Sequence, residues 1–307
     1  MTAIVSERTF PSTYVISLTP FATDESLDEA ALRAHLQRMG EAGIGVYLGG
    51  SGSGEGYTLG LDEQRRILEI GVDVLGPSVR AMGVEPRSAD DMLALGRVAA
   101  AAGVEAMQVY SLDQGHGNRP RRDELERYLR DVLDDLPVHA VLSSHQSVGY
   151  WIPPDLIAQL LDEYDSIVGV NATNQDVTYL VDVIAAVDGR CDVHVGGPMQ
   201  ATIALALGAQ GFLSSDGNIA PKLCVSVIEH HVAGDLAARD AAYATLMDLF
   251  TVTRRCGGIS ATKGCLAKLG FAAGIPRRPR LPVSDAAVAE LVAAVERLGI
   301  PAVESWA

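Results

Sequence analysis

Residues 44–59 read Ile-Gly-Val-Tyr-Leu-Gly-Gly-Ser-Gly-Ser-Gly-Glu-Gly-Tyr-Thr-Leu. The apolar run 44–48 is typical of a buried strand, and the glycine-rich loop after it leads into a predicted helix. The same order, a short apolar run and then an amphipathic stretch, recurs along the chain. This alternation predicts a parallel sheet whose strands are joined by crossover helices.

The number of these units decides the fold class. Eight strand-helix units predict an α/β protein with a TIM (β/α)8 barrel, which we expect over residues 1–220. Two helix starts support the pattern, because Ser26 with Glu29 and Ser88 with Asp91 fit capping boxes. The eight apolar runs are 14–18, 44–48, 79–84, 106–110, 138–142, 167–170, 193–195 and 211–213.

The last part of the chain, residues 221–307, has helical patterns and no further strand pattern. We expect it to be a C-terminal helical extension that packs on the barrel as part of the same structural unit. A basic cluster, 277–280, interrupts it, and we interpret this cluster as a solvated turn in preference to an interaction patch.

Composition excludes several classes of partner. The formal net charge of -15 disfavours nucleic acid and anionic membranes, because like charges repel the phosphates. No apolar run is long enough to span a bilayer. The four cysteines lack metal-type spacing and no secretory segment precedes residue 20, so we expect reduced thiols and a cytoplasmic protein.

Three separate motifs carry a resemblance to a known family. Thr-Pro-Phe stands at 19–21, Ser-Gly-Ser-Gly-Glu at 51–55, and Leu-Gly-Ala-Gln-Gly-Phe-Leu-Ser at 207–214, followed by Asn218 and Pro221. In this order and spacing they resemble the dihydrodipicolinate synthase and N-acetylneuraminate lyase family. The resemblance implies a TIM barrel, a small carboxylated substrate and a homo-oligomer, either a dimer or a tetramer.

The glycine loop 49–55 is the predicted carboxylate site. Successive backbone N–H groups before a helix form an anion-binding concavity, and small residues let a ligand approach closely. We predict that Ser51, Gly52 and Ser53 bind the substrate, with Ser143 and Leu213 at the ends of the fifth and eighth strands. The alternative is that the glycines only make a tight turn at the barrel rim.

Position 171 departs from the family. The resemblance implies a lysine in the sixth strand that forms a Schiff base with a 2-oxo acid, whereas this chain has Asn171. Its only lysines, Lys222, Lys263 and Lys268, fall in predicted outer helices. Class I aldolase chemistry is therefore disfavoured. We predict that the Asn171 amide donates a hydrogen bond to a substrate carbonyl or oxyanion; the alternative is a polar plug satisfied by neighbouring barrel residues.

The predicted acid-base residue is His145. It follows the fifth strand on the same side as Ser143, where the resemblance implies a proton-relaying tyrosine. The alternative is a rim histidine that only bonds a loop. Tyr110 is the third predicted catalytic residue, a phenol that faces the substrate or else merely packs. We predict neither cofactor nor metal, because Glu55, His145, His194 and Asp216 come from separate strands and form no compact ligand motif.

Two function classes remain open. The favoured one is a lyase-like enzyme that acts on a small 2-oxo or hydroxy acid without a Schiff-base lysine. The other is a non-catalytic relative that binds a small acid as a sensor or partner subunit.

Overall fold

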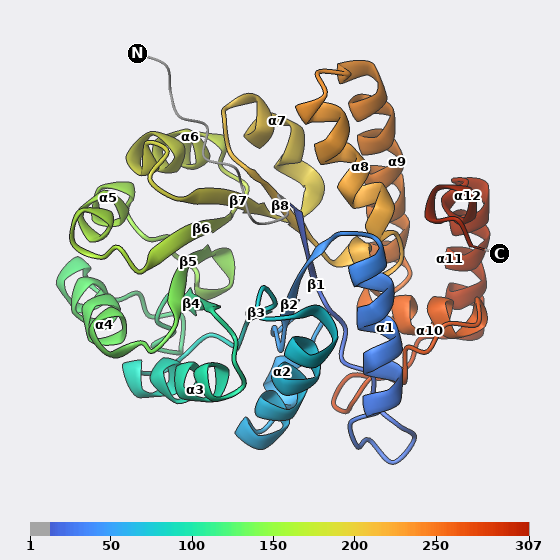
Figure 1. Ribbon diagram of the computed structural model, residues 1–307, viewed down its shortest axis with the longest axis horizontal. Helices are drawn as coiled ribbons and strands as arrows, with labels where there is room; N and C mark the ends of the chain where they lie inside the picture. Colours follow the sequence, from blue (N-terminus) through green and yellow to red (C-terminus); the bar gives the residue numbers. More distant parts are fainter. Residues whose placement is uncertain (1–12, 307) are drawn as a thin grey trace.

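The computed structural model describes residues 13–306 and contains a closed barrel of eight parallel strands (Figure 1). Each strand pairs with the next along the chain, and β1 pairs with β8. The predicted TIM barrel with C-terminal helices is confirmed. The strands are β1 (Thr13–Ile16), β2 (Gly45–Leu48), β3 (Arg80–Ala81), β4 (Ala106–Tyr110), β5 (His139–His145), β6 (Ile167–Thr173), β7 (Asp192–Gly196) and β8 (Gly211–Ser214).

Eight helices surround the barrel, and each follows the strand of the same number. Their apolar faces pack on the outer side chains of the strands, so the core lies between the two layers. The helices are α1 (Glu29–Glu41), α2 (Leu61–Leu75), α3 (Ala89–Ala101), α4 (Arg122–Asp135), α5 (Pro154–Glu163), α6 (Val177–Val187), α7 (Ala201–Ala206) and α8 (Pro221–Val232).

Four further helices complete the described chain, namely α9 (Leu236–Arg255), α10 (Ile259–Lys268), α11 (Asp285–Arg297) and α12 (Ile300–Glu304). Figure 1 shows them on one side of the barrel, next to α8 and α1. They bury their own apolar residues against the barrel helices, among them Leu249, Leu266 and Leu291. Within residues 13–306, no helix is long and apolar enough to cross a membrane.

One of the two predicted helix starts is wrong. Helix α1 is capped by Asp28, whose side chain accepts a 2.9 Å hydrogen bond from the Ala31 N–H. Ser26 instead bonds the Asp24 carboxylate inside the preceding turn. The Ser88 capping box is confirmed, because Ser88 and Asp91 exchange side-chain and backbone hydrogen bonds at the start of α3.

The strand ends bear directly on the site. Active sites of TIM barrels lie at the carboxyl ends of the strands. Strand β5 runs three residues beyond the predicted run 138–142, so that Ser143 and His145 belong to the strand itself. Strand β6 likewise extends through Asn171 to Thr173. These extensions hold the predicted site residues on regular, hydrogen-bonded backbone.

Candidate active site

Asn171 lies inside the barrel, fully buried in a row of hydrogen-bonded side chains. Its Nδ2 donates to Gln108 Oε1 of β4 at 2.8 Å, and Gln108 Nε2 donates to Ser143 Oγ of β5 at 2.5 Å. A longer contact of 3.5 Å joins Nδ2 to the Tyr47 hydroxyl. Both amide hydrogens of Asn171 therefore have partners within the protein.

The other half of the Asn171 amide is unused. Its Oδ1 is buried and has no hydrogen-bond partner among the described residues. An unpaired buried acceptor costs about 1–3 kcal/mol, so this atom is a natural contact for a ligand that carries a donor. The contacts match the polar-plug interpretation for the amino group. The predicted donation to a substrate carbonyl stays a prediction, and it requires Asn171 to release Gln108.

A cationic and aromatic cluster lies beside this row. The Arg80 guanidinium stacks 4.5 Å from the Tyr14 ring centroid and donates to the Tyr47 hydroxyl at 3.1 Å. Predicted binding residue Leu213 packs with both tyrosines as part of the apolar lining. His194 of β7 is buried with its ring edge against Tyr14.

His145 belongs to a second polar cluster, which we call the rim cluster: Glu85, His145 and Ser147. The Ser147 hydroxyl lies 2.6 Å from His145 Nδ1 and donates to Glu85 Oε1 at 2.5 Å. The other carboxylate oxygen of Glu85 accepts from Ser51 Oγ at 3.1 Å. Tyr110 presents its ring to His145 edge-on, with centroids 6.1 Å apart. The structure thus brings predicted residues from the loop after β2, from β4 and from β5 close to one carboxylate.

Burial sets the protonation states in this cluster. It lowers the pKa of His145, although the Glu85 charge opposes the shift, so the imidazole is neutral at neutral pH and can accept a proton. Burial, and then the charge of Glu85, raises the pKa of Tyr110 far above its usual value. Tyr110 therefore stays protonated and can donate a hydrogen bond, but it cannot act as a base.

The glycine loop is tightly folded on itself. A Cβ at Gly54 would meet the backbone N and O of Gly50 at 2.8 Å, and one at Gly56 would meet the Gly49 carbonyl at 2.1 Å. A Cβ at Gly52 would meet nothing within 4 Å. The tight-turn interpretation therefore holds for most of these glycines, whereas Gly52 faces open space, as a ligand-binding position requires. Ser53 beside it is buried.

Lys263 lies on the outer helix α10, as the sequence predicts, but its side chain contacts the glycine loop. The side chain is only 1% exposed and forms an ion pair with Glu55 at the end of the glycine loop. Its Nζ also donates to the carbonyls of Thr19 and Ile275, each at 2.8 Å. Burial lowers its pKa to about 8. Because all three donors are occupied, this amine anchors the loop.

The basic cluster 277–280 is a solvated turn only in part: the Arg278 side chain is 75% exposed, whereas Arg277 is largely buried. Arg277 stacks 4.0 Å from the Phe21 ring centroid and forms a two-pronged ion pair with Glu63. Arg280 is half-buried and donates to the Gly52 carbonyl at 2.9 Å. The C-terminal loop thus fastens the loops after β1 and β2, and it places a positive charge beside the predicted carboxylate site.

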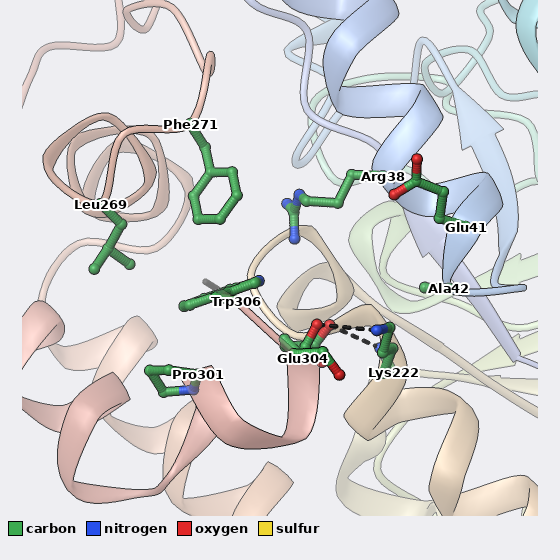
Figure 2. Close-up of a pocket in the computed structure, with 10 residues that line it drawn as sticks. Arg38, Glu41, Ala42, Lys222, Leu269, Phe271, Pro301, Glu304 and Trp306 are labelled. Atoms are coloured by element: carbon green, nitrogen blue, oxygen red, sulfur yellow. Dashed lines mark hydrogen bonds between the residues drawn. The ribbon is translucent and has the colours of Figure 1, made fainter.

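The cavities do not all lie at the site. One of about 570 Å³ lies between α1, α8, α10 and α12, away from the rim cluster (Figure 2). Its polar groups serve the fold: the Glu304 carboxylate caps α8 through the N–H groups of Lys222 and Leu223. A second cavity, of about 510 Å³, is lined by Glu85 and by residues of α2 and α3, and none of the predicted site residues lines it.

The possible metal ligands do not converge. Glu55 is held by Lys263, and Asp216 accepts from the Ser214 hydroxyl in the loop after β8. In residues 13–306, no three His, Cys, Asp or Glu side chains are grouped so that they could hold a metal ion.

Comparison with known proteins agrees with this architecture. The model of the dihydrodipicolinate synthetase family matches residues 10–298. The chain belongs to this family. Its relatives include the 4-hydroxy-tetrahydrodipicolinate synthase of Methanothrix thermoacetophila, 28% identical over 284 residues that cover 92% of this chain and 95% of the relative. That of Acidiphilium cryptum is 27% identical over 300 residues, covering 95% of this chain and 99% of the relative.

Several solved structures have the same fold. YagE, a prophage protein of Escherichia coli K12 solved in complex with pyruvate, has a TM-score of 0.86 at 23% identity and covers 95% of this chain and 100% of its own. Proteus mirabilis N-acetylneuraminate lyase has a TM-score of 0.82 at 21% identity, with 94% and 98% covered.

Sequence reasoning missed Glu85, Ser147 and Gln108. Glu85 carries the clearest signal, because it is a carboxylate directly after the apolar run 79–84, where catalytic residues of a barrel are expected. Gln108 is a polar residue inside the apolar run 106–110 and could have been assigned to the barrel interior. No local pattern distinguishes Ser147 from other loop serines.

Proposed function

We propose that this chain is a lyase-like enzyme that acts on a small carboxylated substrate, a 2-oxo or hydroxy acid, without a Schiff-base lysine. Family membership supports a lyase that handles small carboxylated molecules, and the synthase names of its relatives support an enzyme. The observation that carries the lysine-free mechanism is the rim cluster: a neutral, partly exposed His145 in contact with Ser147 and Glu85, next to the glycine loop.

The proposed roles follow from the contacts. The glycine loop, with Ser51, Gly52 and Ser53, binds the substrate carboxylate, and Arg280 beside it offsets the negative charge of Glu85. His145 transfers the proton next to the substrate carbonyl or hydroxyl.

The remaining predicted residues stabilise the reacting oxygen. Tyr110, held protonated by burial, donates a hydrogen bond to an enolate that no iminium is present to stabilise. Asn171 and Ser143 contact the ligand from the barrel interior, and Leu213 contributes apolar surface. No cofactor is proposed.

The second candidate is a small-acid-binding protein without catalysis. The row of Asn171, Gln108 and Ser143 favours it, because these groups satisfy one another where the resemblance implies a reactive amine. Such a protein would bind the ligand at Ser53 and release it unchanged.

Turnover separates the two candidates. The purified chain is incubated with a panel of small 2-oxo and hydroxy acids, and each reaction is followed by mass spectrometry and by exchange of substrate C–H protons with deuterium oxide. We expect turnover or exchange that falls by about 10²-fold or more in His145→Ala, the range for loss of a general acid-base. His139→Ala, at the exposed start of the same strand, is the matched control. Binding without exchange supports the sensor, and full activity in His145→Ala removes His145 from the mechanism.

We also propose that the chain forms a homo-oligomer, a dimer or a tetramer. Five apolar side chains on α6, the 3-10 turn Pro198–Gln200 and the α7 region are 39–43% exposed, and these are Val177, Val181, Met199, Ile203 and Leu207. Apolar surface of this kind is typical of protein contacts. Light scattering should give a mass of two or four times 32.4 kDa, and Ile203→Asp should reduce it. A monomer at micromolar concentration contradicts this proposal.

A further inference from the structure

Glu85 neither binds the substrate nor transfers a proton in the proposed mechanism, but its position suggests a further role. Its carboxylate is 18% exposed and bonds two hydroxyls, that of Ser51 on the glycine loop and that of Ser147 after β5. It lies 3.9 Å from His145 Nδ1, so it reaches the imidazole through Ser147. The residue thus connects the predicted carboxylate-binding loop with the predicted acid-base group.

The two short contacts decide how the protons are arranged. A carboxylate only accepts, so the Ser147 hydroxyl, 2.5 Å from Glu85, donates to it. The Ser147 oxygen then has only lone pairs left for His145 Nδ1 at 2.6 Å, and this contact is attractive only if Nδ1 carries a proton. The Ser147 backbone N–H is also placed to donate to Nδ1, at 3.1 Å, which favours the other tautomer. The Nδ1–H tautomer requires the shorter chain that ends on the Glu85 carboxylate to outweigh this longer hydrogen bond.

We propose that Glu85 is a positioning residue that fixes the His145 tautomer through Ser147. The chain runs from Nδ1–H to the Ser147 oxygen and from the Ser147 hydroxyl to Glu85, which leaves the lone pair of Nε2 free to accept the substrate proton. When Nε2 takes that proton, the imidazolium forms without rearrangement of the chain, and the Glu85 charge stabilises it. A base oriented by a third group is a general device of acid-base catalysis.

This inference rests on the proposed function for its use, but its test does not. The histidine tautomer is read from ¹⁵N chemical shifts of the full-length protein, with His145 assigned by the His145→Ala variant. Glu85 and Tyr110 are the titratable groups that contact or face the His145 ring, and Tyr110 stays neutral throughout. We expect the parent to show Nδ1–H.

Two variants change different properties of His145. In Ser147→Ala the backbone N–H becomes the remaining partner of Nδ1, so the proton should move to Nε2. In Glu85→Gln the negative charge is lost, and the pKa of His145 should fall. Glu41→Gln, an exposed acid on α1, controls for net charge and should change neither property. An Nε2–H parent, or a tautomer and pKa that are the same in all four proteins, overturns the relay.

Kinetics add a second readout once a substrate is known. Glu85→Gln should lower kcat about tenfold or more with a small change in KM, because the base is misoriented while binding persists. An equal loss through KM alone contradicts a positioning role. If the NMR result holds and no turnover is ever found, the relay stands and the proposed enzyme fails, so the two failures are distinguishable.

Discussion

Lys263 and Glu55 form the most deeply buried ion pair in the described chain, at 1% and 0% side-chain exposure. The two residues are 208 positions apart, so neither could be assigned to the other from the sequence. A lysine in an amphipathic helical pattern is expected to face solvent. Only the folded structure shows that Lys263 contacts the glycine loop. The same holds for Glu85 and Ser147, which are 62 positions apart. Sequence reasoning found His145 because a strand end is a local feature.

Removal of Lys263 should destabilise the protein strongly. Lys263→Met leaves the Glu55 carboxylate buried without its cation, and breaking a buried pair in this way costs about 3–5 kcal/mol. Lys268→Met, exposed on the same helix, should change the free energy of unfolding by less than about 0.5 kcal/mol. Urea unfolding followed by circular dichroism measures both. Equal stability of the two variants would show that the pair does not hold the loop.

At the scale of elements, apolar runs located all eight strands because the interior of a parallel barrel demands continuous buried residues. Their ends were less predictable. Strand β3 has only two residues within the predicted run 79–84, whereas β5 continues through polar residues to His145. These extra residues are hydrogen-bonded to β4 and β6. Polar side chains at the barrel mouth interrupt the apolar pattern. The end of a strand that carries the predicted site residues is therefore the part that an apolar run does not predict.

The glycine loop should discriminate between neighbouring glycines. Gly54→Ala forces a Cβ against backbone atoms of Gly50, and we expect a loss of about 1–3 kcal/mol. Gly52→Ser places its side chain in open space and should leave the free energy of unfolding within about 0.5 kcal/mol of the parent. Thermal unfolding compares the two. If Gly52→Ser is as damaging as Gly54→Ala, then Gly52 does not face an open site.

Helix α1 and the loop after β8 are coupled through a titratable contact. His35 is buried, its Nε2–H donates to Asn218 Oδ1 at 3.0 Å, and burial lowers its pKa to about 3. In the unfolded chain, His35 takes up a proton below about pH 6.5. In the folded protein, the same imidazole stays neutral until about pH 3. Stability should therefore fall as the pH drops below 6.5, by about 2 kcal/mol between pH 7 and pH 5 from this residue.

Asp216 acts in the opposite direction. Burial raises the pKa of Asp216 to about 6, above the pKa of the same carboxyl group in the unfolded chain. Protonation of Asp216 therefore stabilises the folded state as the pH falls from about 6 toward that lower pKa. The two effects partly cancel in the parent, and a variant is needed to separate them. His35→Gln keeps a donor for Asn218 but cannot titrate, so its stability should decline less than that of the parent between pH 7 and pH 5. Parallel pH profiles in urea unfolding would contradict a neutral, buried His35.

For the whole molecule, eight repeats of one supersecondary unit left few alternatives to a closed barrel, and the C-terminal helices followed from the change of pattern after residue 220. The structural role of the C-terminal helices did not follow from that pattern. Through Lys263, Arg277 and Arg280, the extension contacts the loops at the carboxyl ends of β1 and β2 and fixes their shape. These contacts cross more than 200 positions of sequence, and only packing reveals them.

Borohydride trapping tests the central claim most directly. The full-length protein is incubated with pyruvate and other 2-oxo acids and reduced with borohydride, and its mass is measured by mass spectrometry. The Methanothrix thermoacetophila synthase is treated in the same way for comparison. Asn171 carries no amine, and the buried Lys263 is committed to Glu55, Thr19 and Ile275. We therefore predict an unchanged mass for this chain. A reduced adduct mapped to Lys222, Lys263 or Lys268 would contradict the account.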